Sequence, residues 1–584
     1  MPRPMQPQDT TALQGVVQEL SPLLIPSRFE KAQQPSPTAV QLGFRTLRQR
    51  LWLELHWQAD CARFHAVPAP PRSGEGSTLA QQLQHGLSGL ALVRLEQPPW
   101  ERVIELGFAQ RPGAPEQRRL VLELMGRHSN LFLLDERGVV VATGRQVREH
   151  QSRLRPIGTG DAYSPPPPLQ GAIPDPAEPQ ESWQKRLQLL PLPLGKALMD
   201  SYRGISPALR NQLLQSAELD GQQPVMALQT GEWNQLFAAW QQWLQALNAP
   251  LQFRAQGNGY RCWSPEAPSA PSAGEPLAFN LALAHYYGEG QRQQQFQRRS
   301  QQLKQQLQQL IRKEQRELQR QQQLLQRSDD EGLLQKQADL LLCRPDVNST
   351  GHEQLRLADP DGGADLELQL DPQLSLVHQA QKLYQRARKL RRSVAAIEPR
   401  LQLHRQRLEL LENSRLQLEL AEQGDAALLE ALAEDLTPFL EARRSNRSQR
   451  RERERQGVPQ PLELSSPDGL RLLVGRNHLQ NDWISFRQAR RGDLWFHAQE
   501  QPGSHVVLKG SEQLAGDGDL QAAADLAAHF SRSRGNRKVP VVMVPVEQLQ
   551  RIPGMGPGLV RHGGGDVLWG EPDRAVALLP TLAR

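Results

Sequence analysis

Two leucine-rich stretches with coiled-coil spacing constrain the fold of this chain more than any other feature. Five leucines keep approximate heptad positions in the first stretch, and eight apolar residues follow alternating steps of three and four in the second. Gln-rich disorder, the alternative, would not keep eight positions in register. Two such arms predict an antiparallel hairpin of helices, each reaching roughly 50–70 Å at about 1.5 Å per residue. The positions are Leu303, Leu307, Leu310, Leu318 and Leu324, then Leu383, Ala387, Leu390, Val394, Ile397, Leu401, Leu408 and Leu411.

The remaining sequence predicts an α+β protein of several domains, since a chain of 584 residues exceeds the size of one hydrophobic core. We expect a first domain at 1–168, with short strands between 31 and 143 and helices at 10–24 and 79–87. A helical module at 180–250 follows. The coiled-coil hairpin spans 278–430, with a β tip near 352–372 whose strands are separated by "DPDGG". A basic linker at 440–458 precedes a small α/β domain at 460–584.

Two of these segments offer weaker signals for anion binding. "YRGISPALRNQLLQ" has the form of half a helix-hairpin-helix, whose turn can point backbone N–H groups at a phosphate. A plain helical packing module explains it equally well. The linker carries seven arginines and two glutamates between Arg443 and Arg455, which is typical of a solvated linker.

Composition narrows the class of protein. The formal net charge of +6 and the pI of about 9.3 favour acidic partners. The three cysteines, Cys61, Cys262 and Cys343, are too few for a disulfide framework or a four-thiolate zinc site. The chain has neither an apolar signal region nor an apolar run of about 18 residues. We therefore expect a soluble cytoplasmic protein with no membrane partner.

The segment "GDLWFHAQEQPGSHVVLKG" (492–510) is the strongest candidate site. A metal site would need more ligands beside His497 and His505, and a serine hydrolase would need a strained nucleophile elbow that "PGSHV" does not supply. We therefore expect no metal, no cofactor and no catalytic residue. Strand alternation places Leu494, Phe496 and Ala498 on one face, and Trp495 and His497 on the other.

RNA binding explains this segment best. Cations attract phosphates, a Gly-Ser turn offers backbone donors, and aromatic or imidazole rings stack on bases. A tryptophan that merely covers the edge of the core is the structural alternative. The predicted RNA-binding residues are Arg490, Arg491, Asp493, Trp495, His497, Gly503, Ser504, His505 and Lys509, with Arg487 and "SRSRGNRK" adding further cations.

The same segment resembles the signature of the RNA-binding C-terminal domain of the NFACT family. That family includes a bacterial ribosome quality-control factor and proteins labelled fibronectin-binding protein A-like. Further matches follow in order along the chain: "ELMGRHSNLFLLD", "RLRPIGTGDAYSPPP", "YRGISPALRNQLL" and "LQLDPQLSLVHQAQKLYQRARKL". The resemblance also implies that the first domain is similar to the N-terminal domain of formamidopyrimidine-DNA glycosylases.

The resemblance implies a function in ribosome quality control. Family members bind a large ribosomal subunit that carries a stalled chain on tRNA, and bacterial members recruit alanyl-tRNA for mRNA-independent C-terminal alanine tailing. The ribosome forms the peptide bonds, so the protein is not the enzyme. The terminal domains hold tRNA and contact rRNA, while the coiled coil reaches toward a ribosomal protein at the stalk base.

The resemblance also implies positions that contact tRNA. Asp9 occupies the place of a family Asp, and Glu101-Arg102 occupies that of an Asp-Arg pair, one methylene longer at the acid. Arg127 and His128 are further candidates, although Asp9 also suits a helix cap and His128 a strand turn. Gln379 stands where the family commonly has Asn, and the linker is richer in arginine than expected, which leaves tRNA choice open.

Other functions remain as alternatives. The chain could be a general RNA- or ribosome-binding coiled-coil protein without tailing activity, or a coiled-coil scaffold. A DNA glycosylase would need an acid where Arg3 follows Pro2, and also a four-Cys zinc finger, so we expect no DNA partner. A surface adhesin, suggested by the family's older label, would need a signal peptide or wall anchor.

Overall fold

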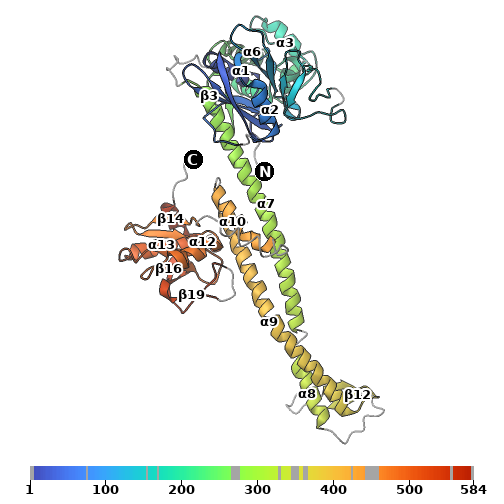
Figure 1. Ribbon diagram of the computed structural model, residues 1–584, viewed down its shortest axis with the longest axis vertical. Helices are drawn as coiled ribbons and strands as arrows, with labels where there is room; N and C mark the ends of the chain where they lie inside the picture. The colour runs from blue at the N-terminus through green and yellow to red at the C-terminus, as the bar shows by residue number, and fades with distance from the viewer. Residues whose placement is uncertain are drawn as a thin grey trace. The chain divides into compact units, whose positions relative to one another are not determined.

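The computed structural model describes residues 5–73, 76–152, 155–167, 170–264, 276–326, 330–343, 354–358, 366–421, 425–440, 459–552 and 557–579. The chain divides into an N-terminal unit, Met1–Gln294, and a C-terminal unit, Gln295–Arg584 (Figure 1). Both units mix helix and sheet, which confirms the predicted fold class. Among these residues no helix has the length and apolar character needed to cross a membrane.

A nine-stranded antiparallel sheet forms the framework of the N-terminal unit. Its strand order is β4-β3-β2-β1-β5-β6-β7-β8-β9, so two meanders join where β1 pairs with β5. A turn at 135–138 connects the last two strands, with Gly138 in the left-handed region at φ 79°. The strands are β1 Ser27–Ser36, β2 Ala39–Arg45, β3 Arg50–His56, β4 Arg63–Val67, β5 Ala91–Glu96, β6 Val103–Ala109, β7 Arg118–Glu123, β8 Asn130–Leu134 and β9 Val140–Thr143.

Two helices lie with this sheet, close to where the apolar periodicity predicts them. Helix α1 (Thr10–Leu24) buries Leu13, Val16, Leu20 and Leu24 on one side, as a 3.6-residue period requires. Helix α2 (Thr78–Leu87) buries Leu79, Ala80, Leu83 and Leu87 in the same way, and the Ser77 hydroxyl caps it by accepting from Ala80 N.

The helical segment after residue 179 shares its core with this sheet. One hydrophobic core includes Leu13 of α1, Leu106 of β6 and Trp240 of α6, so it runs through both predicted domains. Tilted and edge-on aromatic rings fill the helical part, with Trp240 lying 4.7 Å from Tyr202 and 5.0 Å from Trp243 between ring centroids. The elements are α3 Gln180–Leu187, α4 Leu194–Ser201, α5 Pro207–Ser216, α6 Thr230–Ala246, β10 Arg254–Gln256 and β11 Gly259–Arg261.

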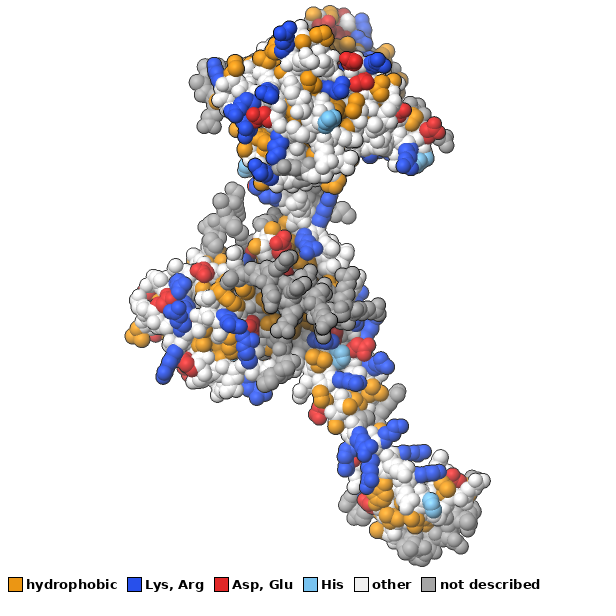
Figure 2. Space-filling view, in the orientation of Figure 1, with side chains coloured by type: hydrophobic (Ala, Val, Ile, Leu, Met, Phe, Trp, Pro, Cys, Tyr) orange, Lys and Arg blue, Asp and Glu red, His pale blue; other side chains and the backbone are white. Residues whose placement is uncertain are grey.

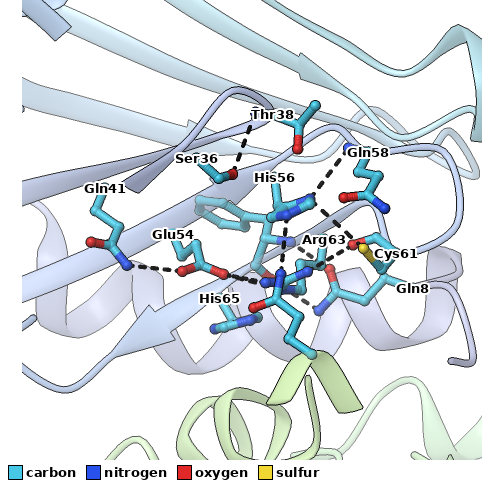
Figure 3. Close-up of polar contacts among 12 residues, drawn as sticks. Gln8, Ser36, Thr38, Gln41, Glu54, His56, Gln58, Cys61, Arg63 and His65 are labelled. Carbon is cyan, nitrogen blue, oxygen red and sulfur yellow. Dashed lines mark hydrogen bonds and ion pairs between the residues drawn. The ribbon is translucent and has the colours of Figure 1, made fainter. Parts of the chain in front are cut away.

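A buried polar cluster fixes the start of the long helix α7 (Ala278–Gln326) on the N-terminal unit. Arg63 donates to Glu54 at 2.6 Å and lies over the Tyr287 ring of α7. Gln291 of α7 lies 3.2 Å from the ring of His56, which also contacts Cys61 (Figure 3). Burial lowers the pKa of His56 to about 3 and raises that of Cys61, so both are neutral and the cysteine is a poor nucleophile.

The predicted antiparallel coiled-coil hairpin is confirmed. Leu307 of α7 packs in one cluster with Leu411 of α9, and Glu314 accepts from His404 at 2.6 Å, so the partner number falls as the residue number rises. His404 thus fills its non-apolar position with a hydrogen bond to Glu314. The 49 residues of α7 and 45 of α9 correspond to roughly 70 Å each. The other helices here are α8 Asp330–Leu342, α9 Leu376–Leu420 and α10 Ala426–Leu440.

The predicted β hairpin lies between the two arms. Strands β12 (Gln354–Leu357) and β13 (Leu366–Gln369) pair antiparallel, while the "DPDGG" turn lies outside the described residues. Gln379, where the resembling family commonly has Asn, holds the entry to α9. Its side chain accepts from Asp371 N at 3.0 Å and donates to Asp371 O at 3.1 Å.

A six-stranded sheet of order β14-β15-β17-β16-β18-β21 forms the C-terminal domain. Short runs rich in Val, Leu and Phe form its central strands, and an alanine-rich segment forms its main helix. The arginine-rich linker lies outside the described residues. The elements are β14 Leu462–Ser465, β15 Arg471–Val474, α12 His478–Trp483, the π-helical turn η3 Ile484–Gln488, β16 Leu494–Ala498, β17 Val506–Leu508, α13 Asp517–His529, β18 Val539–Pro545, β19 Leu549–Arg551, β20 Val560–His562, β21 Asp566–Gly570 and α14 Pro572–Ala575.

Candidate nucleic-acid interface

The two faces of β16 differ as the sequence alternation predicts. Phe496 and Ala498 belong to the core beneath α13, whereas Trp495 belongs to a second apolar cluster with Ile484 of η3 and Val507 of β17. The second cluster covers the Trp495 face of β16 as well, which strand alternation alone does not reveal.

Trp495 is therefore not available as a stacking platform, which corrects the sequence-based assignment. Its side chain is 1 % exposed, and imidazole rings surround it. His497 stacks on it at 5.6 Å between centroids with an interplanar angle of 17°, and His505 meets it edge-on at 5.0 Å. Trp495 thus supports the two histidines rather than an incoming base.

A cavity of about 410 Å³ opens beside this aromatic cluster. His478, His497, His505 and His562 contribute to its lining, together with Asn413 of α9. Burial lowers the pKa of His497 to about 4 and that of His505 well below its ordinary value, so both imidazoles are neutral near pH 7. Glu409 and Glu500 also line the cavity, so it offers neutral imidazoles beside two carboxylates.

Helix α9 closes one side of this cavity. His478 lies 2.7 Å from Leu410 O and 3.2 Å from the Ser414 hydroxyl, through the same ring nitrogen, and Gln417 donates to Ser504 at 3.1 Å. These contributors from the coiled coil were not predicted from the sequence. The heptad pattern marks which α9 residues face α7, but it carries no signal for a second partner.

Asp493 and Lys509 form a buried ion pair, which corrects the assignment of Lys509 to phosphate binding. Their side chains are 0 % and 3 % exposed, and Lys509 also donates to Gln488 O at 3.0 Å. Burial alone would raise the pKa of Asp493, but hydrogen bonds from Lys509 and Ser511 outweigh it and hold the pKa below its ordinary value. This pair ties the 490–493 loop to β17.

The Pro-Gly-Ser turn also differs from the prediction, because its backbone donors are already used. Ser504 N donates to Phe530 O at 3.0 Å, and His505 N donates to Asn481 Oδ1 at 3.1 Å. Gly503 is buried against Ser531. The turn therefore holds the fold together and does not present these N–H groups to a phosphate.

The exposed cations of the segment remain available for RNA. Arg490 is exposed, and the side chain of Arg491 is 94 % exposed, 3.8 Å from Glu547. The basic loop before β18 adds exposed Arg532, Arg534, Arg537 and Lys538. These side chains can supply the sequence-independent phosphate contacts that dominate nucleic-acid affinity.

Asp9 lies in the N-terminal unit, where it caps α1. Its carboxylate accepts from Ala12 N at 2.9 Å and from the Ser206 hydroxyl at 2.7 Å, so the cap interpretation is confirmed. The Gly-Ile-Ser-Pro turn accordingly packs against α1, where Thr10 also donates to Gly204 O. Burial raises the pKa of Asp9.

Glu101 and Arg102 lie beside this cap. Gln97 bridges the two segments by donating to Glu101 O at 2.9 Å and to Thr10 O at 3.3 Å. Burial lowers the pKa of Arg102, while the nearby carboxylates of Asp9 and Glu101 oppose that shift. Within the described part of the chain, its guanidinium has no hydrogen bond or ion pair, which leaves its donors unused.

Arg127 and His128 lie at the same end of the sheet. They occupy the short helical turn η1 (Gly126–His128) between β7 and β8, and both are exposed. Leu124 N donates to Arg102 O at 2.9 Å, so η1 begins close to Arg102. The structure thus places Asp9 beside Glu101 and Arg102, and it places η1 at the same end of the sheet. In the described residues, no group of three or more His, Cys, Asp or Glu side chains is placed to hold a metal ion.

Comparisons with known proteins follow this architecture along the chain. The family model for NFACT N-terminal and middle domains matches residues 9–453, and the model for the NFACT protein RNA binding domain matches residues 462–564. The chain is 26 % identical to Rqc2 homolog RqcH of Streptococcus pneumoniae over 96 % of this chain and 97 % of that protein. It is 23 % identical to Rqc2 homolog RqcH of Bacillus subtilis over 96 % and 97 %.

Two solved structures align with parts of the chain. The N-terminal part of the fibronectin/fibrinogen-binding protein from Streptococcus suis aligns with 20 % identity and a TM-score of 0.37, covering 48 % of this chain and 98 % of that one. The C-terminal part of the same protein aligns with 24 % identity and a TM-score of 0.36, covering 48 % and 98 %.

Proposed function

This chain belongs to the NFACT family, and from that membership we propose that it is a ribosome quality-control factor. In this proposal it binds the large ribosomal subunit that carries stalled peptidyl-tRNA. It recruits tRNA, alanyl-tRNA in the first instance, and supports mRNA-independent tailing of the nascent chain. The peptide bonds form in the ribosome, so the protein's own work is binding and positioning.

One observation carries the tRNA part of the proposal. Asp9 and the Glu101-Arg102 pair are about ninety residues apart in sequence, yet they lie together at one end of the N-terminal sheet. Arg102 keeps an unused guanidinium fork there, and such a fork can donate two parallel hydrogen bonds to a phosphate or a base edge. Half-buried Glu101 supplies a neighbouring carboxylate that a base amino group or a 2′-hydroxyl can satisfy, whereas the buried Asp9 carboxylate caps α1 and acts on Arg102 through its charge.

The other end of the chain supports general RNA affinity. The RNA-binding family match covers the C-terminal sheet, whose surface carries Arg490, Arg491 and the basic loop at 532–538. The α7–α9 hairpin, roughly 70 Å long, suits a strut that reaches across the subunit toward a protein at the stalk base.

The experiment that tests the proposal separates tailing from subunit binding. The double substitution E101A/R102A should abolish tail addition on stalled large subunits, while co-sedimentation with those subunits stays near the wild-type level because the C-terminal cations remain. The matched control is E136A/R137A, which removes an exposed Glu-Arg pair from the β8–β9 turn of the same unit.

Each outcome has a distinct meaning. Tailing at the wild-type rate by E101A/R102A contradicts the tRNA assignment. A wild-type protein that co-sediments with large subunits but adds no tail supports the alternative, a general RNA- and ribosome-binding coiled-coil protein. A wild-type protein that binds neither large subunits nor tRNA contradicts the proposal as a whole.

A further inference from the structure

A row of three arginines crosses neighbouring strands at the other end of the N-terminal sheet. Arg28 of β1 lies opposite Arg45 of β2, and Arg45 lies opposite Arg50 of β3. Neighbouring strands are about 4.8 Å apart, so the row is about 10 Å long. Like charges directly opposite each other on a sheet are destabilising, so this arrangement costs the fold stability that a bound anion would restore.

The row lines a cavity of about 690 Å³, here called the basic cavity. Lys31 and Arg72 also line it, which brings five cationic side chains to one concave surface. Glu30 contributes the one carboxylate among the described residues of the lining. Figure 2 shows Lys and Arg side chains gathered over this part of the N-terminal unit, around β3.

Glu30 neutralises only part of this charge. It pairs with Arg50 at 2.6 Å and with Arg45 at 3.3 Å, and a register shift between Phe29 and Lys31 places it there as the extra residue of a β-bulge. Arg28 and Arg72 are exposed and have no side-chain hydrogen bond or ion pair within the described part of the chain. Two guanidinium forks therefore face the cavity region without an acidic partner.

The hairpin between β2 and β3 extends this surface. Its turn is ordered from within, since Thr46 Oγ1 accepts from Arg48 N at 3.3 Å and from Gln49 N at 3.1 Å. Leu47 at the tip is nevertheless 99 % exposed, next to exposed Arg48. An apolar side chain flanked by cations suits a partner that combines negative charge with flat apolar surface.

We propose that the basic cavity binds the phosphodiester backbone of RNA, as a second contact of the N-terminal unit besides Asp9, Glu101 and Arg102. The inference rests on the proposed function, because RNA is the partner assumed there. Guanidinium groups match phosphate oxygens with two parallel hydrogen bonds. A row about 10 Å long meets more than one phosphate of a strand, whose charges recur every few ångströms.

The two surfaces lie at opposite ends of strand β5. Arg28 pairs with Ala91 at the start of β5, whereas Gln97, which contacts Glu101, follows its last residue, Glu96. Five residue steps separate these ends by about 17 Å. An RNA that contacts both surfaces therefore runs parallel to β5, from one end of the strand to the other, and meets phosphate ligands at each end.

The test uses the full-length protein and its salt dependence. A fluorescein-labelled single-stranded RNA and a tRNA are titrated by anisotropy between 50 and 200 mM KCl, on the order of the range where counterion release is resolved. For R28E/R72E the slope of log K against log salt should become shallower by about 1.4, at about 0.7 per lost single-strand phosphate contact. The affinity at the lowest salt should fall at least about tenfold.

The matched control is R111E/R137E, which reverses two exposed arginines in the β6–β7 and β8–β9 turns of the same unit and changes net charge equally. The inference is overturned if the control loses as much affinity as R28E/R72E, or if R28E/R72E binds both RNAs as the wild type does. R28A/R72A repeats the test without charge reversal and should give the smaller loss of the same sign.

Failure of this inference is distinguishable from failure of the proposed function. Wild-type protein that tails nascent chains, together with an R28E/R72E variant of unchanged RNA affinity, contradicts only the basic cavity. Wild-type protein that ignores RNA contradicts both. Loss of binding to phosphatidylserine vesicles or to a polyglutamate peptide, with RNA affinity kept, would assign the cavity to another anion and overturn the inference.

Discussion

The buried Asp493–Lys509 pair yields the sharpest test of the corrected C-terminal site. Lys509→Ala removes the only side-chain ion-pair partner that the described residues give to Asp493 and leaves a carboxylate that is 0 % exposed. Removing one member of a buried ion pair costs about 3–5 kcal/mol, because the remaining charge stays desolvated. The hydrogen bond from Lys509 to Gln488 O is lost as well.

Hydrogen exchange of the full-length protein measures this cost locally. A loss of about 3–5 kcal/mol lowers the protection of β16 and β17 amides by roughly 10²- to 4 × 10³-fold, at about 1.4 kcal/mol per factor of ten. Arg471→Ala is the matched control, since its pair with Glu512 lies on the same sheet but is largely exposed. That substitution should cost less than about 1 kcal/mol.

RNA affinity distinguishes a structural role of Lys509 from a direct contact between Lys509 and RNA. If Lys509 is structural, RNA binding by the folded fraction of Lys509→Ala keeps the wild-type salt slope. Unchanged exchange protection together with a slope reduced by about 0.7 to 0.9 would refute the reasoning, because it would mean that Lys509 reaches a phosphate after all.

Three further predictions follow from buried polar groups. The pKa of His497 is lowered to about 4, so between pH 6.5 and 4 the unfolded chain binds a proton that the folded chain does not. The C-terminal sheet should therefore lose up to roughly 3 kcal/mol of stability as the pH falls through that window, and His497→Gln should flatten this dependence of stability on pH. Urea midpoints from pulse proteolysis measure the effect. A wild-type midpoint that stays constant across the window contradicts the prediction. Asp9→Asn keeps an oxygen that can cap α1, so its thermal midpoint should stay near the wild-type value while tail addition falls. Asp9→Ala should lose tail addition and also about 1 kcal/mol of folding stability. Tailing retained by Asp9→Asn would exclude a role for the negative charge. Asn280→Ala leaves buried Ala66 N unpaired and should cost about 1–3 kcal/mol of folding stability, seen as faster hydrogen exchange at the start of α7. Gln291→Ala is the milder control. Equal exchange in the two variants would contradict the prediction.

Local periodicity predicted the elements of this fold well. The steps of three and four along Leu383–Leu411 predicted the antiparallel arm, and its one polar position, His404, proved to pair with Glu314. Alternation in β16 correctly separated Phe496 from Trp495. Such patterns succeed because each depends only on the residues of the element itself.

The environment of the site residues could not be predicted in the same way. Alternation tells which face Trp495 occupies, but whether that face is exposed depends on η3 and Val507, which cover it. The contact of Asp9 with Ser206 joins residues 197 positions apart. The pairing of Lys509 with Asp493 depends on the bend at 490–493, so a lysine in a basic segment was assigned to phosphate when it is a buried partner.

Sequencing of the RNA that co-purifies with the full-length protein tests the central claim most directly. Binding to large subunits and tRNA predicts enrichment of large-subunit but not small-subunit rRNA, together with a tRNA isoacceptor, and E101A/R102A should lose the tRNA while keeping the rRNA. Recovery of neither large-subunit rRNA nor tRNA, even at low ionic strength, would contradict the account.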